Sequence, residues 1–379
     1  LWVKRGDALR LATAHQAAVR AYGWAARHAT ADDARFMARA RRARALFSAG
    51  HLGEAEHAAD AIVRDDQDAR FHASTALALV VVAHAHIQRF EFSAALGSAI
   101  RAVGIPADIP PEIRAEALLV FATAGWRLDD PRADASCRDA EAIARQFDLL
   151  DTLSLILATR ATFEERRNDL EAMEATLLDA TIVAARQQRP ELIRRFTHQT
   201  GRLHALAGRF DKAFTYARAA EELALFGAIQ TSTVVSAILC AEALMDAGRP
   251  REAIPLLARY VEHPSPEPSG LWVRYARMAL ARAIVESGVQ NQGDAGQLLD
   301  GALALFRIKG PFVHLDALIH ELIWRNSDGC PEPVLPILEE ASAFSATESK
   351  GLPETGRAGL VLQMSLAHSR LGEYGEVVS

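Results

Sequence analysis

Hydrophobic residues recur every three or four positions along most of this 379-residue chain. The stretches 232–248, STVVSAILCAEALMDAG, and 250–263, PREAIPLLARYVEH, show the pattern clearly. This spacing is typical of amphipathic α-helices, whereas a half-buried strand alternates hydrophobic and polar residues. No stretch has that alternation or the clusters of β-branched residues that strands favour. The pattern therefore predicts an all-α protein.

Short turns, several of them centred on glycine, interrupt the helical pattern at a regular interval. They lie near Gly50, Phe90, Asp130, Asn168, Gly208, Gly248, Gly288, Gly329 and Gly372. The successive intervals are 40, 40, 38, 40, 40, 40, 41 and 43 residues. A fixed period of this length indicates tandem repeats that stack on one another. Because glycine readily ends a helix, each unit is predicted to be a helix, a turn and a second helix.

Small residues recur at fixed distances from these turns. Seven positions before the turns stand Ala43, Ala83, Thr123, Ala161, Gly201, Ala241 and Ala281. Five positions after them stand Ala55, Ala95, Ala135, Met173, Ala213 and Ala253. Small side chains let two helices approach closely, so these positions are predicted to lie where the helices of a pair cross.

The combination of a small residue, a glycine turn and a following alanine resembles the tetratricopeptide repeat. The period is longer than the usual 34 residues or so and falls in the range of HEAT and armadillo repeats, but the small-residue positions favour the tetratricopeptide family. The resemblance implies an α-solenoid of about eight helix pairs wound into a right-handed superhelix. We expect residues 1–379 to form a single solenoid of this kind.

Repeats of this longer length are similar to those of bacterial signalling regulators. Two groups are the ATP-dependent transcription activators like the maltose regulator and the diguanylate cyclases that contain tetratricopeptide repeats. In both, the solenoid binds a ligand or partner and the output domain lies elsewhere. This sequence holds no Walker or GGDEF motif, and its last turn, near Gly372, has no second helix after it. We therefore expect a fragment of a larger protein, cut within a repeat at its C-terminal end.

Charge, the length of apolar runs and cysteine spacing argue against several classes of protein. The net charge of −6 argues against a nucleic-acid surface, which normally shows a basic patch. The longest apolar run, Ala76 to Ile87, is too short to cross a membrane. Cys137, Cys240 and Cys330 are too far apart for a disulfide framework or a CxxC metal site. These features indicate a cytoplasmic protein.

No cofactor or metal site is predicted. His320 begins a segment, HELIW, that resembles the start of a zinc-protease helix, but Trp324 stands where the second histidine ligand is needed. His84 and His86 are two residues apart, so on a helix they point to different faces.

The residues six positions before the turns are candidates for a binding groove, because that face of the first helix lines the inside of tetratricopeptide solenoids. They are Arg44, His84, Ala124, Thr162, Arg202, Glu242 and Arg282, and neighbouring offsets add Glu165, His198 and Tyr275. Two interpretations are open for the charged series Arg202, Glu242 and Arg282. The two arginines hold an acidic partner while Glu242 orients them, or the three form a ladder of ion pairs between neighbouring repeats. Arg44 has no charged neighbour in this row, so a solvated surface arginine is expected there.

The sequence therefore predicts a non-enzymatic scaffold, the sensor or partner-docking region of a bacterial cytoplasmic regulator. Its groove would take a protein, a peptide or a small effector, without nucleic-acid or membrane contact, and the exposed terminal repeats allow oligomerisation. The alternative is the solenoid part of an enzyme, with its output domain outside this chain or a hidden active site in the groove. A carboxylate or histidine with a shifted pKa deep in the groove would favour that alternative.

Overall fold

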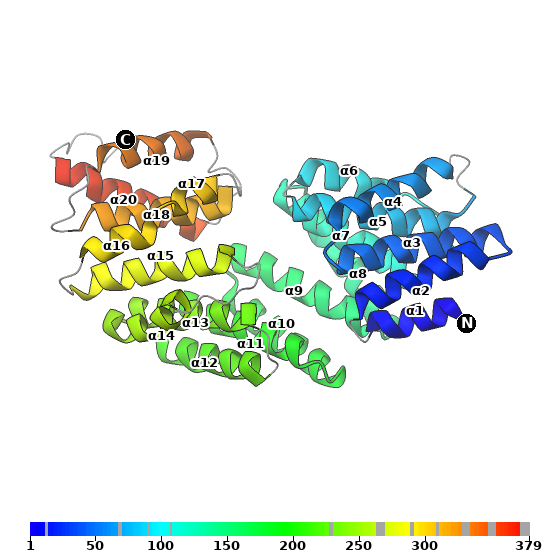
Figure 1. Cartoon of the computed structure of the whole chain (residues 1–379), viewed down its shortest axis with the longest axis horizontal. Helices are drawn as coiled ribbons and strands as arrows, with labels where there is room; N and C mark the ends of the chain where they lie inside the picture. Colours follow the sequence, from blue (N-terminus) through cyan, green and yellow to red (C-terminus); the bar gives the residue numbers. More distant parts are fainter. Residues whose placement is uncertain are drawn as a thin grey trace. The chain divides into compact units, whose positions relative to one another are not determined.

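The all-α prediction is confirmed. The computed structural model describes residues 1–11, 14–66, 70–89, 91–106, 108–226, 230–262, 270–288, 292–307, 311–327, 334–347 and 354–371. In these ranges every regular element is an α-helix (Figure 1). The chain divides into two compact units, an N-terminal unit of residues Leu1–Arg160 and a C-terminal unit of residues Ala161–Ser379.

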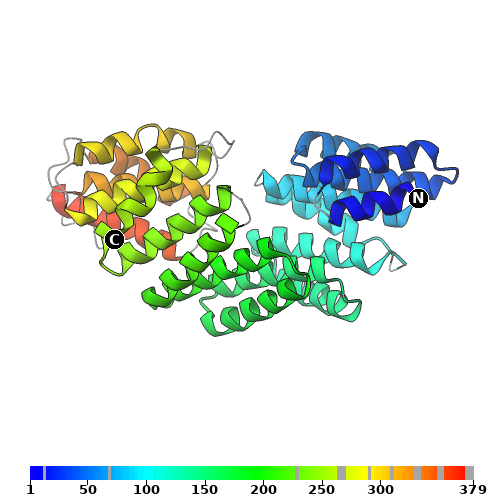
Figure 2. The same ribbon diagram turned by 60° about the horizontal axis from the view of Figure 1, so that its bottom comes forward.

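The helices follow one another as antiparallel neighbours joined by short connections, which Figures 1 and 2 show from two directions. The N-terminal unit contains α1 (Trp2–Leu11), α2 (His15–His28), α3 (Asp32–Ser48), α4 (Leu52–Asp65), α5 (His72–Gln88), α6 (Phe92–Val103), α7 (Pro111–Arg127) and α8 (Ala133–Gln146). The unit boundary falls within α9 (Leu150–Arg166). The C-terminal unit contains α10 (Leu170–Arg186), α11 (Pro190–Leu206), α12 (Phe210–Phe226), α13 (Gln230–Asp246), α14 (Pro250–Glu262), α15 (Gly270–Ser287), α16 (Gln292–Leu299), α17 (Ala302–Arg307), α18 (Pro311–Arg325), α19 (Leu335–Thr347) and α20 (Glu354–Leu371).

The first helices of successive pairs pack against one another within each unit. In the N-terminal unit α3 contacts α5 and α5 contacts α7, while the second helices α4 and α6 pack between them. In the C-terminal unit the same relation joins α11 to α13, α13 to α15, and α15 to α18. A closely spaced row of first helices forms the concave wall of a helical repeat stack. We call these first helices the inner helices and the second helices the outer helices.

The turns after the inner helices α3, α9, α11, α13 and α15 contain a residue with a left-handed backbone. Gly50, Gly208, Gly248 and Gly288 have φ values of 84°, 67°, 74° and 66°, and Asn168 has a φ of 56°. Glycine adopts this conformation without the steric cost of a Cβ atom. The predicted turns are thus confirmed at these five positions. Three further predicted turn positions lie outside the described residues: Phe90, Gly329 and Gly372.

The predicted turn at Asp130 needs a correction of one residue. The left-handed residue is Asp129, with a φ of 55°, and α8 begins only at Ala133. This connection is longer than the one between α11 and α12, and the buried face of α8 lies two residues earlier than the repeat spacing predicts. Ala133 is buried and Ala135, which the repeat spacing placed at the helix crossing, is exposed.

The other small residues are buried as predicted. Seven positions before the turns, the buried residues are Ala43, Ala83, Ala161, Gly201, Ala241 and Ala281. In the third repeat, counting from Asp129 gives Ala122 in place of Thr123, and Ala122 is buried. The positions after the turns that are buried are Ala55, Ala95, Met173, Ala213 and Ala253.

Gly201 shows why some of these positions must be small. A Cβ atom added there would lie 3.1 Å from Cδ2 of Leu239 and 3.4 Å from the carbonyl oxygen of Ala213. The first contact is tighter than an ordinary van der Waals contact, so Leu239 of α13 would have to shift, whereas the second is an ordinary van der Waals distance. Glycine therefore permits the close approach of α11 and α13.

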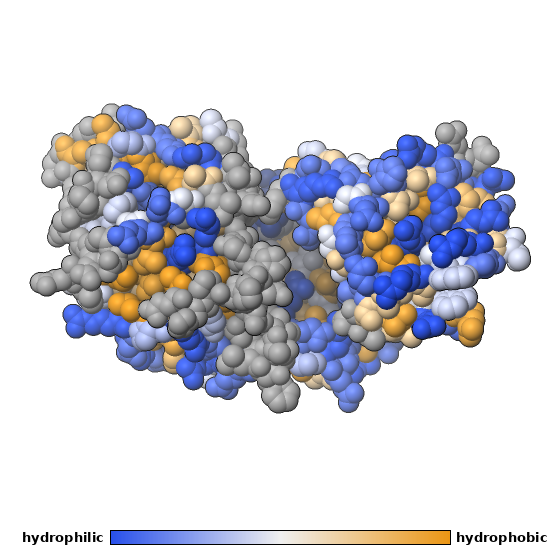
Figure 3. Space-filling view, viewed as in Figure 1, coloured by the Kyte–Doolittle hydropathy of each residue, from blue (hydrophilic) through white to orange (hydrophobic). Residues whose placement is uncertain are grey.

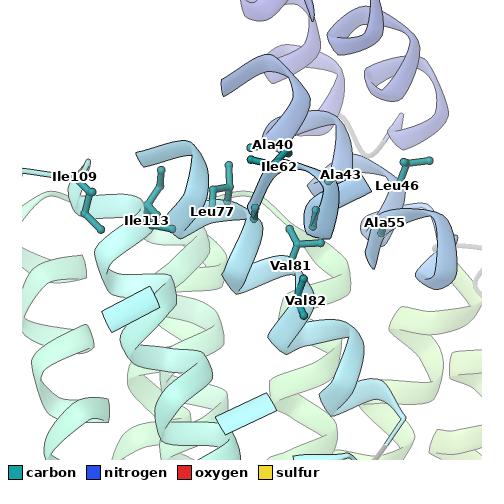
Figure 4. Close-up of a cluster of buried hydrophobic side chains, with 13 residues drawn as sticks. Ala40, Ala43, Leu46, Ala55, Ile62, Leu77, Val81, Val82, Ile109 and Ile113 are labelled. Carbon is teal, nitrogen blue, oxygen red and sulfur yellow. The ribbon is translucent and has the colours of Figure 1, made fainter. Parts of the chain in front are cut away.

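Apolar side chains of successive helices form one of the cores of the N-terminal unit. Figure 4 shows this cluster, which joins residues of α3, α4 and α5 to Ile109 and to Ile113 of α7. Leu77 of α5 and Ile113 of α7 lie near each other in it. These two side chains also line the cavity described below, so the same packing that holds α5 to α7 shapes that cavity.

Candidate functional site

Arg44, on the inner helix α3, forms a charged cluster with two carboxylates of α7. Its Nη1 donates to Oε1 of Glu112 at 3.1 Å, and its Nη2 donates to Oε1 of Glu116. The Arg44 side chain is only 22% exposed. Burial opposes its charge, but the carboxylates of Glu116 and Glu112 leave the pKa of Arg44 above its ordinary value. The expectation of a solvated surface arginine is therefore wrong.

Sequence reasoning missed Glu116, the most buried member of this cluster. Glu116 is 5% exposed, and burial raises the pKa of its carboxyl group against the opposing effect of Arg44. One local signal was available, because Glu116 interrupts the hydrophobic stripe of α7 between Ile113 and Val120. A carboxylate at such a position needs a cation as its partner.

A cavity of about 260 Å³ adjoins the cluster. It is lined by residues of α1, α2, α3, α5 and α7 together with Pro110. Asp7 in its wall accepts from the hydroxyl of Tyr22 at 2.8 Å and from Nη1 of Arg41 at 2.9 Å. Concave sites that combine apolar walls with a few placed polar groups are typical binding sites for small molecules.

His84 occupies the position on α5 that corresponds to Arg44 on α3. It is half-buried, and its ring lies 5.4 Å from the ring of Phe47. Burial, and then the nearby charge of Arg44, lower the pKa of His84 to about 4. The imidazole is therefore neutral at neutral pH. His86 faces elsewhere, where it contacts Glu91 and Glu56.

In the C-terminal unit, Arg202 and Arg282 bind carboxylates of the preceding inner helices. Nη2 of Arg202 lies 2.5 Å from Oε1 of Glu165 on α9. Nη2 of Arg282 donates to Asp246 on α13 at 2.9 Å, and its Nε donates to Glu286 at 2.6 Å. These bonds join neighbouring inner helices, as the ladder interpretation expects. The carboxylates belong to Glu165 and Asp246, however, and not to Glu242. Burial lowers the pKa of Arg282, but the carboxylates of Glu286 and Asp246 raise it by more. The pKa of Arg282 therefore lies above its ordinary value.

The remaining predicted groove residues occupy different surroundings. Thr162 and Glu242 are half-buried on the inner helices α9 and α13. The ring of Tyr275 packs 4.9 Å from the ring of Phe306 on α17. Ala124 is fully buried, because the turn lies one residue earlier than the repeat spacing predicts.

The inner helix α11 carries two arginines that the repeat offsets did not select. Arg194 is half-buried and Arg195 is exposed, and neither forms an ion pair with a carboxylate among the described residues. Partial desolvation lowers the pKa of both guanidinium groups, and the charge of Arg195 lowers that of Arg194 further, against a smaller opposing effect of Glu191. For Arg44 and Arg282, by contrast, neighbouring carboxylates raise the pKa by more than burial lowers it. The pair of adjacent arginines was visible in the sequence, 13 and 14 positions before Gly208.

His198 extends this arginine pair along α11. Because a helix turns once in about 3.6 residues, Arg194, Arg195 and His198 share one side of it. Burial, and then the charges of Arg202 and Arg194, lower the pKa of His198 to about 4. Its buried Nδ1 atom has no hydrogen-bond partner among the residues that the structure describes. We call Arg194, Arg195 and His198 the α11 cationic site.

Other site chemistries receive no support from the described residues. They contain no group of three or more His, Cys, Asp or Glu side chains that could hold a metal ion. None of their helices has the length and apolar character needed to cross a membrane. Cys240 is fully buried, and burial raises the pKa of its thiol to about 12. On the face of the N-terminal unit seen in Figure 3, hydrophilic and hydrophobic side chains are mixed.

No protein-family model matches this sequence, and no curated protein matches it either. Solved structures do resemble it. The Rap protein complexed with Competence and Sporulation Factor is 11% identical, with a TM-score of 0.60 and coverage of 98% of both chains. The apo form of the quorum sensor NprR from B. thuringiensis is 11% identical, with a TM-score of 0.62 and coverage of 99% of this chain and 94% of that one.

A third structure contains the repeat by name. It is a signal transduction ATPase with numerous domains, from Pyrococcus horikoshii, that has a tetratricopeptide repeat sensor. It is 12% identical, with a TM-score of 0.57, and the match covers 90% of this chain and 55% of that one. At such identities the likeness shows the fold, and it confirms a tetratricopeptide-like helical solenoid.

Proposed function

We propose that this chain is a non-enzymatic binding scaffold, the sensor or partner-docking region of a bacterial cytoplasmic regulator. The inner helices of its C-terminal unit hold an acidic segment of a protein or peptide partner. The observation that carries this proposal is the α11 cationic site. Similarity of fold to a quorum sensor and to a tetratricopeptide repeat sensor supports the sensor role.

Unpaired arginines on an inner helix are a poor arrangement for stability alone. The charge of Glu191 offsets the desolvation of Arg194 only in part, and no carboxylate among the described residues offsets that of Arg195. An incoming carboxylate would form charge-assisted hydrogen bonds to these guanidinium groups, which are stronger than bonds between neutral groups. The neutral imidazole of His198, with its free Nδ1, adds a hydrogen-bonding group beside them.

The proposal modifies the groove hypothesis based on Arg202 and Arg282. Both arginines already bind carboxylates of the chain, so a partner would have to displace Glu165, Asp246 or Glu286. Arg194 and Arg195 need no such exchange. They are therefore the main contacts of the acidic segment, with Arg202 at the edge of the site.

Fluorescence anisotropy tests this proposal with two labelled peptides, one rich in glutamate and one with glutamine at the same positions. We expect the glutamate peptide to bind more tightly, and R194A/R195A to weaken it by about tenfold or more. The matched control, R218A/R251A, removes two exposed arginines from the outer helices α12 and α14 and should leave binding unchanged.

A second double variant separates the two groups of arginines. R202A/R282A should leave binding of the glutamate peptide within about twofold of the parent, because its arginines serve mainly the ion pairs between helices. Equal affinity for the glutamate and glutamine peptides, or equal losses in the R194A/R195A and R218A/R251A variants, would contradict the proposal.

One observation favours the enzyme alternative. Glu116 and His84 are groups with shifted pKa values on neighbouring inner helices. Structural ion pairs shift pKa values as well, however, and the carboxylate of Glu116 is occupied by Arg44. A non-enzymatic scaffold with a structural ion pair therefore explains the shifted pKa values of Glu116 and His84 with fewer assumptions.

A further inference from the structure

Arg10 differs from the other arginines that line the cavity of the N-terminal unit. The nearest carboxylate oxygen, Oε1 of Glu112, lies 3.9 Å from its Nη2, which is beyond hydrogen-bonding distance. That oxygen already accepts from Arg44. The Arg10 side chain is only 22% exposed, and the structure gives it no hydrogen bond among the described residues. A guanidinium group has five N–H donors, so most of its bonding capacity is unused.

The neighbouring arginines have partners. Nη1 of Arg41 donates to both carboxylate oxygens of Asp7, at 3.0 and 2.9 Å. Arg44 donates to Glu112 and Glu116. The carboxylates of this region are thus engaged by the other two guanidinium groups. Arg10 remains as the cation that faces the cavity without a hydrogen-bonded anion.

The rest of the cavity restricts the shape of a ligand. Met37, Leu77 and Ile113 provide apolar walls. The volume of about 260 Å³ lies just below the roughly 300–1,000 Å³ typical of sites for drug-sized ligands. Oε1 of Glu112 accepts from Arg44, whereas its Oε2 makes no hydrogen bond with the described residues and is available to an ammonium group.

We propose that this cavity binds a small carboxylate with a compact aliphatic body, such as a free branched-chain amino acid. The carboxylate accepts hydrogen bonds from Arg10, and the aliphatic part packs on Met37, Leu77 and Ile113. An amino group, where present, donates to Glu112. This site lies in the N-terminal unit, and it stands independently of the α11 cationic site.

Isothermal titration calorimetry with four compounds tests the assignment. L-Leucine, 4-methylpentanoate and N-acetyl-L-leucine carry the carboxylate, and L-leucinamide lacks it. We expect L-leucine or 4-methylpentanoate to bind and L-leucinamide to bind at least about tenfold more weakly, since it cannot accept the bidentate bonds of Arg10. If L-leucine is preferred, the natural ligand is an amino acid, and if 4-methylpentanoate is preferred, it is a simple carboxylic acid. Preference for N-acetyl-L-leucine would indicate the carboxyl end of a peptide and overturn the assignment of a free small molecule.

Variants of Arg10 complete the test. R10M should lower the affinity for the preferred carboxylate at least about tenfold. R10K should lower that affinity by an intermediate factor, because lysine keeps the charge but not the planar guanidinium fork. The matched control R20M removes an exposed arginine of α2 and should leave binding unchanged. Unchanged affinity in R10M, with an unchanged melting temperature, would overturn the proposal. R10M should also bind the glutamate peptide normally, so failure here is distinguishable from failure of the proposed function.

Discussion

At the scale of single residues, the charged groups of the inner helices divide into those with internal partners and those without. Arg44, Arg202 and Arg282 have carboxylate partners contributed by other helices. Arg195 has no such partner among the described residues, and its pKa is lowered by burial. The distinction separates arginines with partners inside the fold from arginines that we propose bind another molecule.

The buried pair of Glu116 and Arg44 provides a test of stability. E116Q removes a nearly buried carboxylate and leaves Arg44 with Glu112 alone. We expect the free energy of unfolding to fall by about 2–3 kcal/mol, since breaking a buried charged pair leaves the other charge uncompensated. The control E112Q changes a carboxylate that is 41% exposed and should cost under about 1 kcal/mol. Urea denaturation measures both, and equal losses would show that burial of Glu116 adds nothing.

His198 predicts a pH dependence with a defined sign. Its pKa falls from an ordinary 6.5 to about 4, so the unfolded chain binds the proton more readily than the folded one. The folded state is therefore destabilised as the pH falls from 6.5 towards 4, and the full stability is present above 6.5. H198Q should reduce the difference in melting temperature between about pH 7 and about pH 5. An unchanged difference, matching the control H57Q at an exposed histidine, would contradict the burial of His198.

At the scale of helices and turns, left-handed residues follow several inner helices and, in two repeats, the outer helix as well. One follows the inner helix, as at Gly208. The other follows the outer helix, at Asp148 and Gln188, which are 40 residues apart with φ values of 51° and 53°. The second series was not predicted, because neither residue is glycine. The sequence pattern reveals a turn most easily where glycine already marks it.

Exchanging the residue types at two of these turns should change stability in opposite directions. G208A places a Cβ atom at a φ of 67°, and we expect a loss of about 1–2 kcal/mol, although no neighbouring atom lies within 4 Å of that Cβ. Q188G relieves the same strain, and we expect a gain of about 0.5–1 kcal/mol, reduced by the greater freedom of glycine in the unfolded chain. Thermal unfolding monitored by circular dichroism measures both, and a loss in Q188G would contradict this account.

At the scale of the whole molecule, a stack of repeats transmits damage mainly between neighbours. Ala253 is fully buried in a cluster of α13, α14 and α15. A253L should overpack that cluster and cost about 1–3 kcal/mol. The control A175L, at an exposed position of the outer helix α10, should cost much less.

Hydrogen exchange shows how far the damage spreads. We expect A253L to reduce protection in α13, α14 and α15 and to leave α3, α5 and α7 of the N-terminal unit as in the parent. Uniform loss of protection along the chain would show that the molecule unfolds as one cooperative body. A melting temperature equal to that of the parent would instead show that the repeat alignment at Ala253 is wrong.

The sequence by itself determined the helices, five of the turns after inner helices and most of the places where paired helices cross. Each depends on residues that are close together in the chain: hydrophobic spacing of three and four, glycine at a left-handed turn, and alanine at Ala213 and Ala253. The error at Asp130 was local too, because the left-handed residue is Asp129 and the buried face of α8 lies two residues earlier than the repeat spacing predicts.

Only the tertiary structure decided which charges are paired. The partners of Arg44 lie two repeats away on α7, 68 and 72 residues along the chain, and the wall of inner helices brings them together. Arg10 and Arg195 could not be distinguished from surface arginines by spacing, since an absent partner leaves no mark in the sequence. Ion pairing depends on distance in space, and the packing of inner helices sets that distance.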